Sequence, residues 1–407
     1  MRPDKVWQVA RKEILSTLRD RRAIVSSLLI PLLILPFVML GLPLALGSLF
    51  EREQSATTLA AVAGLDALPP ELRAAIEAQA VELYASDDPE TQVREGDAVV
   101  GLSVPPEFAA QVAAGAAELT LYSKRSNLRS ELNVSKLEDA VSDYRDDLVS
   151  ARLEAAGLDA GVLEPVTTTS VDASSEAERQ SGQFAWLIPF FIGIWTLTGG
   201  QMTALDATAG EKERGTLEAL LVSPVRRIEV VLGKFLATLT FGLSAALMAI
   251  IGYVLSGTLL RRALVPLLGE GGETMADLFG GSLSVTVPTV LTLIISALLL
   301  AGFVAAVLIS VATFARSYKE AQTYVAPLSM VMIVPVIGLQ FADFIGGNVL
   351  IYLVPLLNVL LLMNDVVKGN AAPLAVLLTW GSLAAFTGLL LDLAYRTFKR
   401  EGVIFRT

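Results

Sequence analysis

Residues 210–234 combine charged and apolar side chains in a pattern that another protein could bind. They read GEKERGTLEALLVSPVRRIEVVLGK. Leu217, Leu220 and Leu221 recur at helical spacing after a mixed-charge turn, which predicts a short amphipathic helix. Ser223-Pro224 then fits an N-cap and the first position of a second helix. A partner protein that grips the short helix would rotate the segments attached to it. On composition alone, a solvated surface loop is the alternative interpretation.

The residue types needed for most enzyme chemistry are missing from the sequence. There is no cysteine and no histidine, which excludes disulfides, thiolate or imidazole metal centres, cysteine nucleophiles and a Ser-His-Asp relay. No G-x-x-x-x-G-K-[ST] loop occurs, and the closest fragment, Gly233-Lys234-Phe235, lacks the upstream glycine and the hydroxyl residue. G-x-S-x-G and H-E-x-x-H are absent as well. We therefore expect no catalysis, no metal site and no cofactor bound by this chain.

Composition indicates that the elements around residues 210–234 are membrane helices. The 407-residue chain is 53% hydrophobic and 18% charged, with a mean hydropathy of +0.60. Several uncharged runs exceed the roughly 20 residues that cross a bilayer. The first run is too long for a signal-peptide core of ~7–15 residues, and its three prolines are expected to kink it or end it early. Six transmembrane spans are predicted, at residues 23–50, 180–205, 235–260, 285–315, 321–342 and 369–391.

Residues 343–368 are apolar but interrupted by Gly346, Gly347 and Pro355, which predicts a re-entrant pair of short helices instead of a seventh crossing. Taken together, the segments 1–22, 206–234, 316–320 and 392–407 contain more Lys and Arg than Asp and Glu, whereas 51–179, 261–284 and 343–368 are acidic. The positive-inside rule therefore predicts that both termini are cytoplasmic, in the cell membrane. The net charge of −10 argues against a nucleic-acid partner.

Residues 51–179 have the composition of a water-soluble domain on the outer side. Strands are predicted at 57–63, 81–85, 98–104, 118–122 and 165–171, and helices at 70–80, 106–114 and 127–156. Asp143, Asp146 and Asp147 are interpreted as a solvated helix face, since they lack a calcium-loop spacing. The predicted fold class is an α-helical polytopic membrane protein with six transmembrane helices, a re-entrant external helical hairpin and an inserted α/β extracytoplasmic domain.

Residues 1–22 carry a second amphipathic pattern. Its apolar positions share one predicted face, and its basic positions point away, so the helix is expected to lie along the inner leaflet or to pack on a partner protein. The apolar face contains Val6, Trp7, Ala10, Ile14, Thr17 and Leu18. The polar face contains Lys5, Gln8, Arg11, Lys12, Ser16 and Arg19.

Four segments together carry a family resemblance. They are EKERGTLEALLVSPVRR in the loop, KEILSTLRDRRA at 12–23, AVVGLSVPPEF at 98–108 and YLVPLLNVLLLMNDVVKG at 352–369. In this order, and over nearly the whole chain, the sequence resembles ABC-2 type permeases, specifically their sodium-exporter-like (NatB-like) branch.

The resemblance implies an export permease, not itself an enzyme, whose partners are a separate ABC ATP-binding subunit, a second permease copy or paralogue, and the lipid bilayer. ATP and Mg²⁺ would then bind only to the partner subunit. The ATPase-coupling residues that it implies are Glu211, Glu213, Arg214, Gly215, Thr216, Leu217, Glu218, Leu220 and Leu221. The residues of the N-terminal helix beside them are Lys12, Glu13, Arg19 and Asp20.

Gln201, Asn358 and Asp365 are the candidate pathway residues, the last two in the external re-entrant region. Sodium export would favour oxygen ligands inside the membrane, where polar residues more often bond neighbouring helices. An amphipathic molecule, a lipid or a peptide fits the apolar spans at least as well as an ion. A membrane-anchored receptor or interaction scaffold acting through residues 51–179 is the alternative function. A transporter driven by ions alone is disfavoured by the scarcity of carboxylates in the spans.

Overall fold

The computed structural model describes residues 1–41, 44–45, 56–115, 117–124, 126–163, 168–169, 171, 173–181, 185–217, 223–259, 262, 266, 287–339 and 348–399. Two compact units are formed, one from Met1–Pro43 with Ala173–Thr407 and the other from Leu44–Asp172.

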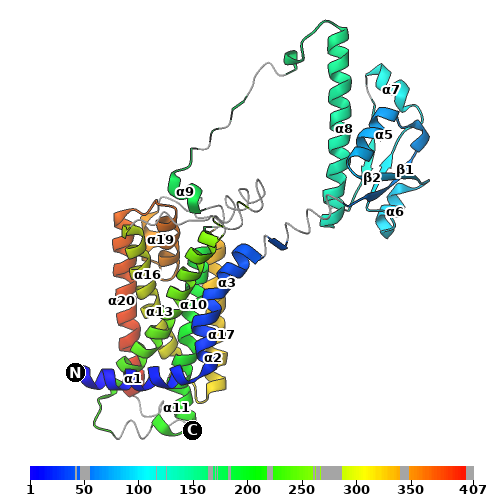
Figure 1. The fold of residues 1–407 in the computed structure, drawn as a ribbon. Helices are drawn as coiled ribbons and strands as arrows, with labels where there is room; N and C mark the ends of the chain where they lie inside the picture. The colour runs from blue at the N-terminus through cyan, green and yellow to red at the C-terminus, as the bar shows by residue number, and fades with distance from the viewer. Residues whose placement is uncertain are drawn as a thin grey trace. The chain divides into compact units, whose positions relative to one another are not determined.

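The first unit is a bundle of apolar helices that run side by side, with α1 lying across one end (Figure 1). We call this end the α1 end and the opposite one, where α19 lies, the α19 end. Its long helices are α10 (Leu187–Leu205), α13 (Arg227–Leu259), α16 (Val287–Ala312), α17 (Tyr318–Leu339) and α20 (Pro373–Lys399). Its shorter elements are α1 (Pro3–Arg19), α2 (Arg21–Ile24), η1 (Val25–Leu29), α3 (Ile30–Pro36), η2 (Phe37–Gly41), α9 (Glu176–Ser181), η5 (Asp206–Gly210), α11 (Glu211–Glu213), η7 (Val349–Leu353) and α19 (Leu357–Val367).

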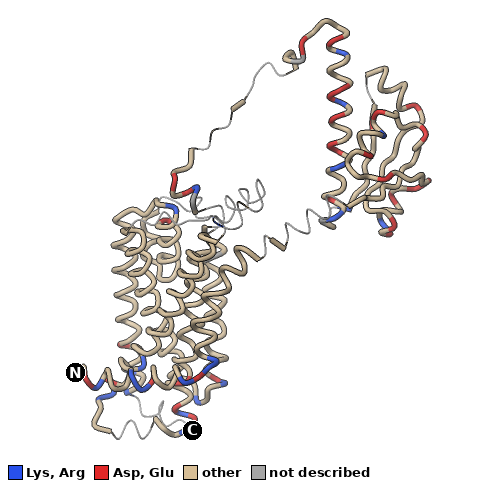
Figure 2. Tube along the Cα trace, in the orientation of Figure 1, with Lys and Arg blue, Asp and Glu red and all other residues tan. Residues whose placement is uncertain are grey.

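Five helices in the described part are long and apolar enough to cross a membrane, namely Arg21–Gly41, α13, α16, α17 and α20. Between their ends the bundle is free of acidic and basic residues over most of its length (Figure 2). The predicted span 180–205 corresponds to α10, a 19-residue helix that packs along α13 and α16. Its second half contains Gly199, Gly200 and Gln201.

The first apolar helix continues through Pro31 and Pro36, which the sequence predicts to kink it or end it early. Two π-helical stretches, η1 and η2, precede and follow the segment that holds these prolines. Because proline has no amide hydrogen and crowds the preceding turn, a widened turn lets the helix continue. The third proline, Pro43, lies outside the described residues.

Glycines on α13 let three other segments approach its backbone closely. A Cβ atom on Gly233 would lie 2.5 Å from Cβ of Val9 in α1, and one on Gly252 would lie 2.5 Å from the Leu32 carbonyl oxygen in α3. Such distances are shorter than any side chain tolerates, so these positions require glycine. A Cβ atom on Gly242 would lie 3.0 Å from the Thr196 carbonyl oxygen in α10. Helix α13 is therefore the element around which α1, α3 and α10 are assembled.

The second unit is built on a four-stranded sheet in the order β2-β1-β3-β4, in which β4 is antiparallel to β3 and the other pairs are parallel. Its strands are β1 (Thr58–Ala63), β2 (Val81–Ala85), β3 (Val100–Ser103) and β4 (Thr120–Tyr122), and its helices are η3 (Leu65–Ala67), α5 (Pro70–Ala78), α6 (Pro89–Glu95), α7 (Phe108–Ala114), α8 (Leu128–Ala155) and η4 (Ala160–Val162). Leu72, Ile76 and Leu137 are fully buried in its core.

One helix of this unit was missed from the sequence, and one expected strand is not found where the structure describes it. Helix α6 was not predicted, because its sequence PETQVRE is mostly polar and only its first residue, Pro89, and Val93 are buried, which gives no clear helical period. A strand was expected at 165–171, but Thr168, Thr169 and Val171 are not in a strand, and the rest of this segment lies outside the described residues.

Candidate functional site

The loop after α10 is fastened to the α1 end of the bundle. The chain leaves α10 through the π-helical turn η5 and enters α11, and Gly215 then turns it with a left-handed φ of 70°. Leu217 is buried and joins the apolar core of the bundle. Glu218, Leu220 and Leu221, which the sequence places on the same short helix, lie outside the described residues.

A cluster of two carboxylates and two ammonium groups joins three elements at this place. The Lys234 side chain of α13 is fully buried, and its Nζ donates to Glu13 Oε1 of α1 at 3.2 Å, to Glu211 of α11 and to the carbonyl of Ala207. Lys12 donates to the same two carboxylates, at 3.1 Å for Glu13. We call Lys12, Glu13, Glu211 and Lys234 the charge cluster.

Opposite charges alternate in the charge cluster, which favours the ionised form of Glu211. Burial raises the pKa of Glu211, but the Lys234 and Lys12 ammonium groups outweigh burial and hold that pKa below its usual range. Partial burial lowers the pKa of Lys12, whereas its hydrogen bond to Glu211 and the charges of Glu13 and Glu211 raise it above the usual value. A buried lysine with two carboxylate partners and one carbonyl partner has its donors satisfied.

The start of α13 is held by a third buried carboxylate, outside the charge cluster. Glu229 is fully buried and accepts from the Arg226 amide at 2.9 Å and from the Arg2 amide at 2.8 Å. The Arg2 guanidinium bonds to Glu229 at 3.2 Å and to the Pro224 carbonyl at 2.6 Å. The predicted start at Ser223-Pro224 was wrong, since α13 begins at Arg227. Glu229, at the third helical position, caps the Arg226 amide, and Arg2 holds the Pro224 carbonyl in the preceding bend.

Two more side chains connect the loop with the turn between α16 and α17. Lys212 Nζ donates to the carbonyls of Thr313 and Ala315, at 3.2 and 3.1 Å, which lie just after the end of α16. Glu213 accepts from the Tyr318 amide at 2.7 Å, at the first residue of α17. A displacement of α11 therefore acts on the ends of α16 and α17 as well as on α1 and α13.

The outer surface of the loop is formed by Arg214, Gly215 and Thr216, which are exposed. Arg214 pairs with Asp206 of η5 at 2.9 Å, and Thr216 donates to the Glu211 carbonyl at 3.3 Å. We call these three residues the loop tip. Its groups face solvent, as does Glu213 before it, whereas Leu217 after it is buried.

The remaining N-terminal candidates lie apart from the charge cluster. Arg19 is exposed, and Asp20 caps α2 by accepting from the Arg22 amide at 2.8 Å. The predicted apolar face of α1 is only partly correct, because Val6 and Ala10 are buried together with Val9 and Glu13, whereas Trp7 and Leu18 are exposed. The bundle covers a face turned away from these two side chains, since α1 packs at Gly233 through Val6 and Val9.

The candidate pathway residues do not form one site. Gln201 lies near the end of α10 that leads into the loop. Asn358 is buried at the start of α19, where its amide donates to Ser382 at 2.7 Å and to the Tyr352 carbonyl at 3.3 Å. Asp365, further along α19, accepts from the Tyr352 hydroxyl, and burial together with this carboxylate raises the Tyr352 pKa. Asn358 and Asp365 thus share Tyr352 as a neighbour, whereas Gln201 belongs to the other end of the bundle.

Sequence reasoning named Lys12, Glu13 and Glu211 but missed Lys234, Glu229 and Arg2. The sequence singles out Lys234 only in Gly233-Lys234-Phe235, which does not match a phosphate-binding loop, and not as a partner of Glu13 or Glu211. The available signal was an isolated charge on the inward face of an apolar helix, three residues after the paired valines Val230 and Val231. Lysine and glutamate are rarely fully buried unless they are paired, so such positions call for a partner elsewhere in the chain.

A bundle of apolar helices with a charged loop clamped to one end is the architecture of a multi-pass membrane protein. Residues 7–403 match the model of the ABC-2 family transporter proteins, and the chain belongs to this family of ABC transporter permeases.

Among characterised relatives, the chain is similar to the ABC transporter permease protein NatB of Bacillus subtilis (strain 168), with 29% identity over 398 residues that cover 97% of each chain. It is also similar to the uncharacterized protein YhcI of the same organism, with 27% identity over 121 residues, 29% of this chain and 36% of that protein.

Proposed function

We propose that this permease moves substrate out of the cytoplasm with energy from ATP hydrolysed by a separate ATP-binding subunit. That subunit binds ATP and Mg²⁺ and docks on the loop at the α1 end. The single observation that carries the proposal is the charge cluster, which ties the loop to α1 and α13 through the buried side chains of Glu13, Glu211 and Lys234. Family membership supports the same assignment.

The proposal includes a topology. Helix α10 serves as the sixth span beside the five that satisfy length and composition, so that both termini lie in the cytoplasm, at the α1 end. The short elements η7 and α19 form a re-entrant pair at the outer side, and the sheet unit is extracytoplasmic. Two permease copies, or one copy and a paralogue, pair in the membrane. The excess of Lys and Arg in the segments assigned to the cytoplasm supports this orientation.

The mechanism follows from how the loop is held. The ATP-binding subunit presses on the loop tip, which is exposed and free to be covered. Because Glu211 bonds to Lys12 and Lys234, the displacement moves α1 and α13 together with α11. Lys212 and Glu213 transmit it to the ends of α16 and α17. Rigid coupling of this kind converts a local push into a rotation of several spans.

The test is the ATPase activity of a copurified complex with the ATP-binding subunit. We expect Arg214→Glu at the loop tip to lower permease-stimulated ATPase activity at least tenfold, because it reverses a charge in the docking surface. Arg396→Glu is the matched control, since Arg396 is also exposed and pairs with an aspartate of its own helix at 2.8 Å. Equal activity in both variants would contradict the proposal, as would transport that does not depend on nucleotide. A receptor scaffold would instead show no transport, and its function would depend on residues 51–179 and not on nucleotide.

A further inference from the structure

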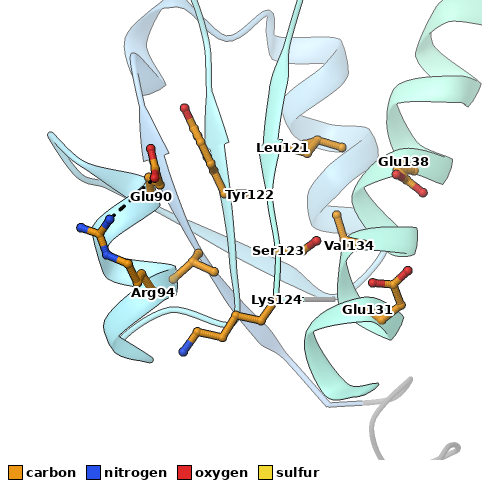
Figure 3. A pocket seen from close by; sticks show the side chains of 10 residues that line it. Glu90, Arg94, Leu121, Tyr122, Ser123, Lys124, Glu131, Val134 and Glu138 are labelled. Carbon is orange, nitrogen blue, oxygen red and sulfur yellow. Dashed lines mark ion pairs between the residues drawn. The ribbon is translucent and has the colours of Figure 1, made fainter. Parts of the chain in front are cut away.

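The unit formed by Leu44–Asp172 contains a groove of about 690 Å³ along the outer edge of β4 (Figure 3). One wall is α6 and the other is α8, and β4 with the two residues after it lies between them. The lining residues are Glu90, Val93, Arg94, Leu121, Tyr122, Ser123, Lys124, Glu131, Val134 and Glu138.

The floor of the groove is an unpaired strand edge. Strand β4 is the last in the sheet order and pairs with β3 on one side only, with Leu121 opposite Leu102. In an antiparallel ladder, successive residues point their amide and carbonyl groups alternately toward and away from the partner strand. Among the described residues, nothing bonds to the groups that β4 points away from β3. Such an edge is a template for one more strand.

The two walls are reached by alternate side chains of the strand. Tyr122 and Lys124 lie on the α6 side, whereas Leu121 and Ser123 lie on the α8 side (Figure 3). Tyr122 packs with Val93 of α6, and Leu121 packs in the cluster that contains Val134 of α8. A strand added beside β4 would alternate in the same way, with every second side chain entering each wall.

The walls carry opposite charges. On the α6 side the basic groups are Arg94, which pairs with Glu90 at 3.8 Å, and Lys124, whose ammonium lies at Gly96 beyond the end of α6. On the α8 side the groove is flanked by the exposed carboxylates Glu131 and Glu138, which are two helical turns apart on one face. The α6 side therefore carries one net positive charge, because Glu90 offsets Arg94 and leaves Lys124, whereas the α8 side carries two negative charges.

The difference in charge between the two walls distinguishes two possible occupants, which are β4 of a second copy of this chain and a segment of different sequence. If β4 of a second copy paired with β4, the two-fold axis would be perpendicular to the continuous sheet, so each wall would meet its own copy. Glu131 and Glu138 would then face the same carboxylates, and like charges that meet across a strand pair are destabilising. A segment of different sequence can place acidic side chains on one face and basic side chains on the other.

We propose that this groove binds an extended segment of another polypeptide, which adds to the sheet as a fifth strand. Its acidic side chains point toward Arg94 and Lys124, and its basic side chains, at the alternate positions, point toward Glu131 and Glu138. Main-chain hydrogen bonds to β4 supply affinity, and the charged walls supply selectivity. The site is built from the sheet unit alone, so its failure would leave the proposed transport function untouched.

The probe is a fluorescein-labelled peptide, Thr-Glu-Lys-Glu-Lys-Glu-Lys-Thr, added to the full-length protein in lipid nanodiscs. We expect saturable binding with a Kd below on the order of 1 mM, together with slower amide hydrogen exchange in residues 117–124. Two control peptides have the same composition. One has its glutamates and lysines in separate blocks, and the other has N-methyl groups on alternate amides, which removes the strand donors. Both are expected to bind at least tenfold more weakly.

Charge reversal in the α8 wall supplies the matched protein variants. Glu131→Lys combined with Glu138→Lys is expected to weaken binding of the alternating peptide at least tenfold. Glu154→Lys, on the same helix but outside the groove, is expected to leave binding unchanged. All three positions are exposed, so the fold of the unit is retained.

Absence of saturable binding would overturn the proposal. So would equal binding of the N-methylated or block-charged peptide, or equal binding by the α8-wall variant. Protection of residues 117–124 that appears without peptide and grows with protein concentration would show self-pairing of β4 and would overturn it as well.

Discussion

At the scale of single residues, the buried ammonium of Lys234 is the centre of the α1 end. It has no exposed surface and is held by Glu13, Glu211 and the Ala207 carbonyl, which belong to three different segments. Moving charges out of water is costly, and mutual attraction offsets that cost only while every partner is present. The charge cluster therefore fixes the arrangement of α1, α11 and α13 relative to one another.

Replacing Lys234 by methionine is expected to destabilise the bundle by about 3–5 kcal/mol, because two buried carboxylates lose their main counter-charge. The measurement is urea-induced unfolding of the protein in detergent micelles. Lys12→Ala is the comparison, since its side chain is 52% exposed, and it is expected to cost about 1 kcal/mol or less. Adding Glu13→Gln and Glu211→Gln to Lys234→Met should restore much of the loss. A Lys234→Met protein as stable as the parent would show that the charge cluster does not stabilise the arrangement of α1, α11 and α13.

The charge cluster also predicts a pH dependence. The pKa of Glu211 is lower in the folded protein than in the unfolded chain, so its ionised form stabilises the fold above the unfolded pKa of about 4.3. This contribution is lost as the pH falls from that value through the lower folded pKa. We expect Glu211→Gln to reduce the loss of unfolding free energy between pH 5 and pH 3. The reduction should correspond to the uptake of roughly one proton fewer on unfolding. Parallel stability curves for the two proteins would contradict this.

At the scale of elements, α1 is positioned by a close crossing over α13. Gly233 has no side chain, so Val9 and the Val6 carbonyl of α1 approach the α13 backbone directly. The crossing brings Glu13 within reach of Lys234, one residue beyond the glycine on α13. The small residue and the buried ion pair are therefore parts of one contact.

Gly233→Ala is expected to push α1 off α13 and to cost about 1–3 kcal/mol, because the new Cβ atom would lie 2.5 Å from Val9 and 3.0 Å from the Val6 carbonyl oxygen. Hydrogen exchange of residues 3–19 should become faster. Gly388→Ala in α20 is the control, since a Cβ atom there has nothing within 4 Å. If α1 exchanges equally slowly in both variants, the close crossing does not hold the helix.

At the scale of the whole molecule, the chain carries two separate apolar cores. One belongs to the helix bundle and contains Leu300, and the other belongs to the sheet unit and contains Leu137, both fully buried. Each unit therefore has the means to fold on its own core. Neither Leu137 nor Leu300 contributes to the charge cluster.

Two core substitutions test this independence. Leu137→Ala is expected to destabilise the sheet unit by about 2–5 kcal/mol and to leave the bundle transition unchanged, because the cavity arises in one core only. Leu300→Ala is expected to do the reverse. Scanning calorimetry of the protein in nanodiscs should then show two transitions that shift separately. One transition that moves as a whole in both variants would mean that the units unfold as one.

Much of the secondary structure follows from local pattern. Four apolar runs are long enough to predict membrane helices, and these lie near 227–259, 287–312, 318–339 and 373–399. Shorter apolar runs predict the strands β1 to β4. Leu217 could also be recognised as an inward-facing residue of the loop. Helix α6 was not predicted because it buries few apolar side chains. The start of α13 was misplaced because it depends on the contacts of Glu229 with Arg2 and Arg226, which the local pattern Ser223-Pro224 does not reveal.

The composition of the chain and the spacing of its apolar residues determine that it is a helical membrane protein with a polar loop of recognisable sequence. The tertiary structure alone determines which charges are paired. Glu13 and Lys234 are 221 positions apart, and Arg2 and Glu229 are 227 apart, so no local periodicity relates them. Their pairing arises because burial makes a lone charge intolerable, and only the folded bundle decides which opposite charge lies within reach.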